Sequence, residues 1–168
     1  MKSSKPNVAE MADKIRRTLG YSQTGPISFA DLCDRNRNLT IVQRPFSENT
    51  SGMCVKDGSE SGIIAINSTM ALGRQRFTLA HELYHFYYSN NPFIVCPSDE
   101  DNAKTEDERN ANIFATHFLM PTQSFIAYFE DVCGASLSID TILKMEHYFQ
   151  VSRRALLSKF CSLGYLSQ

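Results

Sequence analysis

The 168-residue chain lacks the features that define several large classes of protein. It has no run of about 18 apolar residues, so no membrane-spanning helix is expected, and its N-terminus has no apolar stretch of signal-peptide length. The five cysteines are odd in number and never spaced as C-x-x-C, which argues against a disulfide framework and against a thiolate zinc site. A net charge of −1 provides no global basic field for nucleic acid or lipid. These absences favour a cytoplasmic protein whose thiols are mostly buried and inert.

What the chain does have suits one globular domain, since 42% of its residues are hydrophobic and 21% are charged. Residues 1–7 are expected to form a flexible tail and residues 8–168 a single domain. Hydrophobic periodicity and turn residues predict helices at 8–20, from 26–28 onward, and at 74–89, 106–120, 122–134, 138–149 and 152–164, with strands at 39–45, 51–57 and 62–67 and a polar, acidic loop at 90–107. This order predicts an α+β fold with a small, mostly antiparallel sheet packed on a helical bundle.

One predicted helix carries an unusual group of polar residues. The segment RFTLAHELYHFYY (76–88) is apolar or aromatic nearly all round, yet it contains His81, Glu82 and His85. A buried carboxylate is costly unless it is paired, neutralised or bound to a metal. Histidines four residues apart share a helix face and can bind one metal ion, and Glu82 is then placed to contact a water on that ion. Zinc is the usual metal of an H-E-x-x-H motif, and manganese or iron are the alternatives. Two hydrogen-bonded core histidines beside an ion-paired glutamate are the alternative interpretation.

A catalytic zinc requires a third protein ligand and an open position for water. The acidic candidates are Asp99, Glu100, Asp101, Glu106, Asp107 and Glu108. Helical spacing favours Glu108, because it shares a face with Asn112 and with the small residues Ala111 and Ala115, whereas Glu106 and Asp107 are expected to point elsewhere. Asn112 is placed to accept a hydrogen bond from a ligand histidine, with His81 as the favoured partner. The alternatives are a plain N-terminal helix acid and a buried amide.

The segments RQRFTLAHELYHF and ERNANIFATHFLMP resemble the ImmA/IrrE family of zinc-dependent metallo-endopeptidases. The resemblance extends from about residue 8 to the end of the chain. It implies a zincin-like fold with the motif on a central helix, a single metallopeptidase domain over 8–168, and metal binding by His81, His85 and Glu108. It also implies a narrow substrate, typically a helix-turn-helix repressor whose cleavage derepresses mobile-element, stress-response or toxin–antitoxin genes. Tyr84 stands where the family usually has glycine. This difference leaves the expected metal ligands unchanged, but the substrate preference of the family does not carry over to this chain.

In the expected mechanism, zinc lowers the pKa of a bound water and Glu82 acts as general base. Tyr84 either narrows the cleft, directs its hydroxyl at the substrate or fills the core. The strand GIIAIN (62–67) is expected to present a free edge to an extended peptide, with Ile64 and Ala65 in contact, or to be an ordinary sheet member, and the two interpretations are not exclusive. The acidic loop 99–107 selects a basic substrate segment, gates entry to the cleft or is simply solvated. The second oxyanion stabiliser is not identified by the sequence; nominal candidates are Tyr84, Tyr87, Tyr88, Tyr128, His117 and His147.

Two other functions are compatible with the sequence. The first is a peptidase-like module that binds a regulator without cleaving it. The presence of Glu82 argues against this module, because metal binding alone does not require a general base. The second is DNA binding by the helix-turn-helix-like segment TILKMEHYFQVSRRALLSKF, with phosphate contacts from Lys144, Arg153, Arg154 and Lys159. The net charge disfavours direct nucleic-acid binding. No separate DNA-binding segment precedes the motif helix, so the repressor is expected to be another polypeptide.

Overall fold

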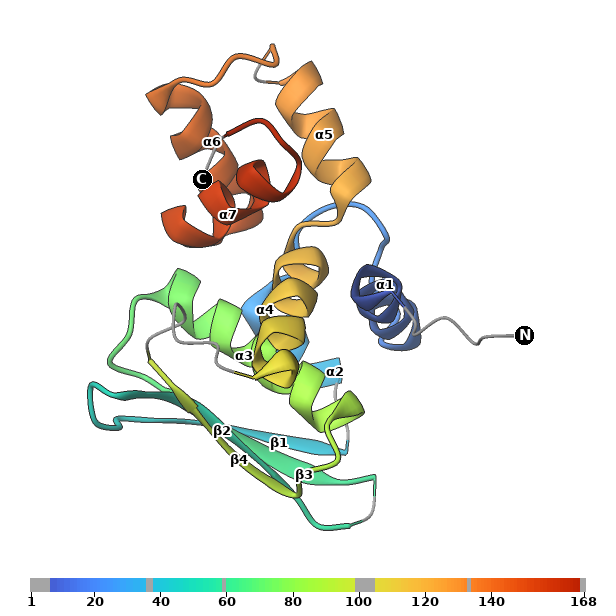
Figure 1. Cartoon of the computed structure of the whole chain (residues 1–168), viewed down its shortest axis with the longest axis vertical. Coiled ribbons are helices and arrows are strands. Elements are labelled where there is room, and N and C mark those ends of the chain that lie inside the picture. Colours follow the sequence, from blue (N-terminus) through green and yellow to red (C-terminus); the bar gives the residue numbers. More distant parts are fainter. Residues whose placement is uncertain (1–6, 36–37, 59, 99–104, 133, 167–168) are drawn as a thin grey trace.

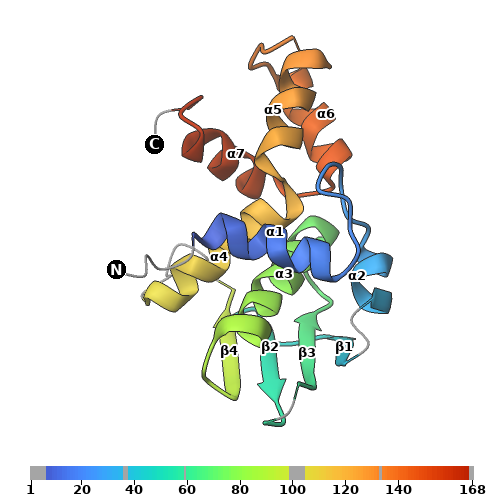
Figure 2. The same ribbon diagram turned by 90° about the vertical axis from the view of Figure 1, so that its right-hand side faces the viewer.

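The chain forms a four-stranded sheet with helices stacked on one of its faces (Figures 1 and 2). The computed structural model describes residues 7–35, 38–58, 60–98, 105–132 and 134–166. Within these ranges the elements are α1 (Val8–Thr18), α2 (Phe29–Arg35), β1 (Leu39–Arg44), β2 (Thr50–Lys56), β3 (Gly62–Asn67), α3 (Leu72–Tyr88), β4 (Phe93–Pro97), α4 (Glu106–Leu119), α5 (Thr122–Asp131), α6 (Ile139–Phe149) and α7 (Arg153–Ser162).

The strand order is β1-β3-β2-β4, in which β1 and β3 are parallel and the other two pairings are antiparallel. Side chains alternate between the two faces of a strand, and β4 shows the consequence. Phe93 and Val95 are 60% and 47% exposed, whereas Cys96 is buried. The buried face therefore lies toward α3, which packs on β2 and β3.

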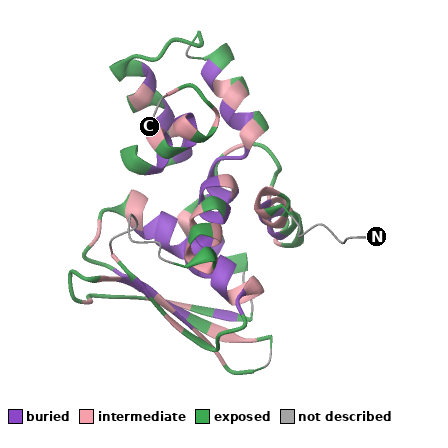
Figure 3. Ribbon diagram, in the orientation of Figure 1, coloured by how far each residue is buried: buried purple, intermediate pink, exposed green. Residues whose placement is uncertain are grey.

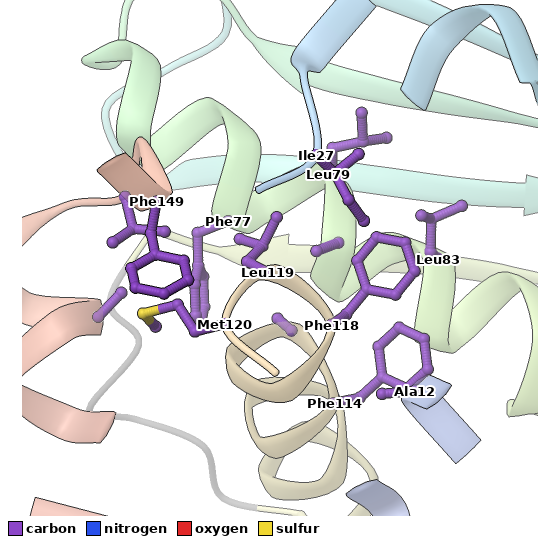
Figure 4. Packing of buried hydrophobic residues seen from close by; sticks show 14 of the residues in the cluster. Ala12, Ile27, Phe77, Leu79, Leu83, Phe114, Phe118, Leu119, Met120 and Phe149 are labelled. Carbon is purple, nitrogen blue, oxygen red and sulfur yellow. The ribbon is translucent and has the colours of Figure 1, made fainter. Parts of the chain in front are cut away.

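A second layer is formed by α4, which packs on α3, and by α1, which packs on α4 (Figure 2). Ala111 and Ala115 are fully buried and small, and such residues let two helices approach closely. Figure 4 shows Phe114 and Phe118 of α4 projecting into this layer, where their rings stack with centroids 5.5 Å apart. The buried Arg16 guanidinium of α1 donates a hydrogen bond to the Phe118 carbonyl. These contacts fix α4 over the motif helix.

Helices α5, α6 and α7 gather at the end of the molecule away from the sheet (Figures 1 and 3). Ser152 caps α7 by accepting a hydrogen bond from the Ala155 amide, as its position in the sequence predicts. The first turn of α3 touches this group directly, because a Cβ at Gly73 would lie 2.8 Å from the Ser152 nitrogen. Helix α4 thus contacts α1, and the first turn of α3 contacts the start of α7.

The predicted α+β class with a small, mostly antiparallel sheet is confirmed. Two expectations are wrong. Residues 93–97 lie in the segment predicted as a polar loop, but they form β4. This strand has only five residues, follows Pro92 and ends at Pro97. Because proline disfavours a strand assignment, the sequence pattern does not predict it. Strand β3 has no free edge, because β1 and β2 pair with its two sides. Most of the predicted acidic loop, residues 99–104, lies outside the described residues. Within the described ranges, no helix combines the length and apolar character needed to cross a membrane.

Candidate active site

The motif histidines and Glu82 lie on α3, which packs between the sheet and α4. His85 and Glu82 are 0% exposed and His81 is 7% exposed, so all three polar side chains are withdrawn from water. Helix α3 is buried on nearly every side between Gln75 and His85. A helix in this position normally carries only apolar side chains, since buried polar groups require partners.

The partners are the two histidines themselves and Glu108 of α4. His81 Nε2 lies 3.1 Å from His85 Nε2. One oxygen of Glu108 lies 3.2 Å from His81 Nε2, and the other lies 3.3 Å from His85 Nε2. Contact with His81 and then with His85 lowers the pKa of Glu108 to about 2, so this carboxylate is ionised at neutral pH. Two ring nitrogens and one carboxylate therefore converge on a single point.

The tautomers follow from the groups on the far side of each ring. His81 Nδ1 donates a 2.9 Å hydrogen bond to Asn112 Oδ1, so the proton of this ring faces away from Glu108. His85 Nδ1 lies 3.4 Å from Asp107 Oδ2, and a proton on Nδ1 is favoured by this carboxylate. With the ring protons on the outer nitrogens, both Nε2 lone pairs and the Glu108 carboxylate could be directed at a single cation. A cation there would replace the imidazole–carboxylate contacts that lower the pKa of Glu108 in its absence.

The donor set fits a catalytic zinc ion. Tetrahedral zinc with bonds of about 2.0–2.2 Å to nitrogen and oxygen keeps neighbouring ligand atoms roughly 3.3–3.5 Å apart. The three observed separations lie between 3.1 and 3.3 Å. The Glu108 side chain is 22% exposed, so this side of the triangle is open to solvent. Two imidazoles and one carboxylate are also the chemical set that such a zinc site uses.

The Glu82 carboxylate packs against Gly52 of β2. A Cβ at Gly52 of β2 would lie 2.8 Å from Glu82 Oε1, so only a residue without a side chain leaves room for this carboxylate. Neither Glu82 oxygen has an aligned hydrogen-bond donor among the described residues. Burial raises the pKa of Glu82 to about 7, and the nearby His81 and Cys96 only partly offset the effect. A carboxyl group of this kind exchanges a proton near neutral pH.

The sequence-predicted site residues divide into two groups. The structure brings together His81, Glu82, His85, Glu108 and Asn112, as described above. The three predicted substrate contacts, Tyr84, Ile64 and Ala65, lie elsewhere or have other roles.

Tyr84 is 5% exposed, and its ring packs against Phe114 and Tyr88 with centroids 5.8 and 5.7 Å away. Burial raises the pKa of Tyr84, and the neighbouring Asp107 raises it further. The structure therefore supports the core-filling interpretation of this ring. Ile64 is fully buried, and β3 lacks the free edge that would let Ile64 or Ala65 pair with a peptide.

Two residues at the site are not predicted by the sequence. Asp107, expected to point away, reaches the outer nitrogen of His85; a first-turn side chain can do so because α4 meets α3 at its N-terminal end. Cys96 of β4, expected to be an inert core thiol, is buried as expected but lies within the donor cluster. Its location depends on the pairing of β4 with β2, which no local sequence pattern encodes.

Other histidine and tyrosine candidates contact different parts of the protein. His117 lies 3.2 Å from the buried Lys159 ammonium, and burial together with this cation lowers the pKa of His117 to about 4. Tyr88 donates a hydrogen bond to the Met11 carbonyl, and Tyr128 stacks on Tyr148 with centroids 3.9 Å apart. None of these contacts directs the group toward Glu108.

Comparison with known proteins agrees with this geometry. Residues 35–160 match the family model described as the IrrE N-terminal-like domain of peptidase family M78. No curated protein matches the sequence significantly. Among solved structures, a Mycobacterium tuberculosis transcriptional regulator superposes with a TM-score of 0.58 at 16% identity, covering 92% of this chain and 46% of that one. The chain thus spans less than half of that regulator, and the likeness concerns the fold.

The fold, the two-histidine helix and the family match define a metallopeptidase-type domain. More specifically, the chain belongs to the ImmA/IrrE family.

Proposed function

We propose that this protein is a zinc-dependent endopeptidase, with manganese or iron as alternative metals. The observation that carries the proposal is the convergence of His81 Nε2, His85 Nε2 and the Glu108 carboxylate within 3.1–3.3 Å, next to a buried Glu82. A zinc ion held by these three residues supplies a water of lowered pKa and polarises the scissile carbonyl.

In the proposed reaction, protein side chains transfer the proton and orient the metal ligands. Glu82 takes the proton of the attacking water and delivers it to the leaving amine, and its pKa of about 7 suits transfer in both directions. Asn112 orients His81 through a hydrogen bond to its outer nitrogen, and the Asp107 carboxylate lies 3.4 Å from the outer nitrogen of His85. The hydrophobic surroundings of α3 keep bulk water from the carboxylate.

We further propose that the substrate lies along β4. No described strand pairs with the outer side of β4, and Cys96 places this strand beside the ligand atoms. An extended peptide can add to such an edge through backbone hydrogen bonds. This location replaces the edge of β3, which is occupied by β1.

The proposed substrate is a helix-turn-helix transcriptional repressor on a separate polypeptide, in the cytoplasm. Cleavage would relieve repression of mobile-element, stress-response or toxin–antitoxin genes. Membership in the ImmA/IrrE family supports this substrate class, and the regulator name of the structural neighbour agrees with it.

The alternative of direct DNA binding by α6 and α7 is weakened by the contacts of its cations. Lys159 is 0% exposed and donates a hydrogen bond to Thr122 Oγ1. Lys144 pairs with Asp140 at 2.8 Å, and Arg153 pairs with Glu146 at 2.8 Å. Lys159 is therefore unavailable to a phosphate, and the charges of Lys144 and Arg153 are partly neutralised by their acidic partners. A binding module that never cleaves would have no use for the costly burial of Glu82.

The metal content of purified wild-type protein and of Glu108→Ala tests the site. About one zinc per chain is expected in the wild type, with loss or weakening in the variant; Glu106→Ala, which changes an exposed acid in the first turn of α4, is the matched control and should retain the metal. Cleavage of a candidate helix-turn-helix repressor, with Glu82→Gln as the inactive control, then tests catalysis. A wild-type protein that retains no metal after saturation with zinc, manganese or iron and removal of the excess would refute the peptidase and favour the silent binding module.

A further inference from the structure

Cys96 is the one sulfur donor close to the proposed metal centre among the described residues. Cys96 is 2% exposed and pairs across the sheet with Gly52. Side chains of directly opposed residues lie on the same face of a sheet, and the Cβ direction of Gly52 leads to Glu82. The thiol of Cys96 therefore faces α3 beside the general base, in the space that Gly52 leaves open.

The thiol also lies close to the ligand triangle. The Sγ atom and the donor atoms of His81, His85 and Glu108 all lie within 4.8 Å of one another. A zinc–sulfur bond of about 2.3 Å in a tetrahedral site places the sulfur roughly 3.5 Å from the other ligand atoms. The separation to be closed is about 1 Å, which is less than the roughly 3 Å that a change of χ1 rotamer moves a cysteine sulfur.

A second observation points to the same space. Both oxygens of Glu82 are fully buried and have no aligned hydrogen-bond donor among the described residues. Thus a buried carboxylate and a buried thiol lie beside the three metal donors. Structural zinc sites are closed by four protein ligands, whereas catalytic sites keep one position for water.

We infer that Cys96 is a fourth protein ligand that closes the centre and makes the peptidase latent. This inference rests on the metal centre proposed above. On closure Cys96 would lose its thiol proton to a Glu82 oxygen, and the resulting thiolate would hold the metal together with His81, His85 and Glu108 in the position otherwise left to a water. No oxidant or reductant is required. The closed state lacks both the attacking water and the ionised base, so opening requires the sulfur to withdraw toward β4.

Cobalt substitution tests the inference without relying on activity. Wild-type protein, Cys96→Ala and Cys54→Ala are loaded with Co²⁺, and metal per chain is measured beside the near-ultraviolet spectrum. Cys54 is the matched control, because it is 1% exposed and lies two residues from Gly52 on the same face of β2 but outside the donor cluster. A thiolate-to-cobalt charge-transfer band is expected in the wild type and in Cys54→Ala, and its loss is expected in Cys96→Ala at unchanged cobalt content.

Zinc X-ray absorption of the wild type provides a measurement that needs no variant, and one sulfur at about 2.3 Å is expected. One metal per chain with neither a thiolate band nor a sulfur neighbour would overturn the inference while leaving the peptidase intact. A band that survives in Cys96→Ala would also overturn it. No bound metal in the wild type would overturn the metal centre itself, and with it both proposals.

Discussion

Gly52→Ala should impair catalysis without removing any metal ligand. The added methyl group would lie 2.8 Å from Glu82 Oε1 and 2.7 Å from Thr78 Cγ2. Ordinary carbon contacts begin near 3.4 Å, so the two neighbours must each give way by about 0.6–0.7 Å. Thr78 has a short, branched side chain on α3, and the Ala65 carbonyl closes the third side at 3.1 Å. Thr78 and Glu82 must both shift, and Glu82 has the longer side chain and therefore the greater freedom to move.

The displacement has a calculable consequence for the reaction. Misplacing a reacting group by about 1 Å costs roughly 100-fold in rate, so a shift of somewhat less predicts a roughly 10- to 100-fold fall in kcat. Overpacking a tight interface costs about 1–3 kcal/mol in the free energy of unfolding. Metal affinity should change little, because His81, His85 and Glu108 lie on α3 and α4 rather than on β2.

The assay compares zinc content, urea unfolding and repressor cleavage for wild type, Gly52→Ala and Gly62→Ala. Gly62 is the matched control, since a Cβ there would lie 2.6 Å from the Val55 carbonyl and 2.9 Å from the Phe86 ring, straining the same helix–sheet interface away from Glu82. Gly62→Ala should lose stability but keep its turnover per folded molecule. Full-speed cleavage by Gly52→Ala at unchanged zinc content would refute the placement of Glu82 against β2.

Three further outcomes are expected. Asn112→Ala should lower zinc affinity roughly 10- to 100-fold, because it removes the hydrogen bond that orients His81, and equilibrium dialysis against a competing chelator measures the loss. Lys56→Met should lower the free energy of unfolding by about 1–3 kcal/mol, because the Lys56 ammonium donates hydrogen bonds to three carbonyls at the end of α3. As the pH falls from 6.5 to 4, stability should fall by at most about 3 kcal/mol through His117, because the unfolded chain binds a proton there before the folded chain does.

Each of these outcomes has its own control. Ile113→Ala changes an exposed neighbour of Asn112 and should leave zinc affinity unaltered. Lys14→Met removes a lysine from α1 and should cost far less stability than Lys56→Met. His117→Gln should show a shallower loss of stability in acid than the wild type. Equal acid sensitivity in the two proteins would contradict the assignment of this titration to His117.

Much of this fold is encoded locally in the sequence. The spacing of His81 and His85 places both rings on one face of a helix, and the three- and four-residue steps from Glu108 through Ala111 to Asn112 define the face that α4 presents to it. These are properties of helical geometry, so they can be derived before any tertiary structure is known. The α+β class follows from the order of helical and strand patterns in the same way.

The rest depends on contacts between distant segments. Strand β4 is short and bounded by prolines, and its side-chain alternation becomes evident only when it pairs with β2. The approach of Cys96 to the donor cluster depends on that pairing. The requirement for glycine at position 52 depends on the packing of α3 against β2. The predicted direction of Asp107 is wrong for a related reason. Helical periodicity specifies directions around one axis, but not the end at which two helices meet.

The pH dependence of unfolding tests whether burial of Glu82 lowers the stability of the folded protein. Burial raises its pKa in the folded protein to about 7 from an ordinary value of 4.5. The folded chain therefore holds a proton that the unfolded chain has released, so the metal-free protein should lose stability as the pH rises from 4.5 to 7. The total loss is about 3 kcal/mol at most and is complete above a pH of about 7. A glutamine side chain cannot ionise, so the advantage of Glu82→Gln over wild type in urea unfolding with chelator should be greater at a pH of about 8 than at about 5. A difference independent of pH would show that Glu82 is ionised and stabilised by a partner, and the argument that its burial serves proton transfer would fail.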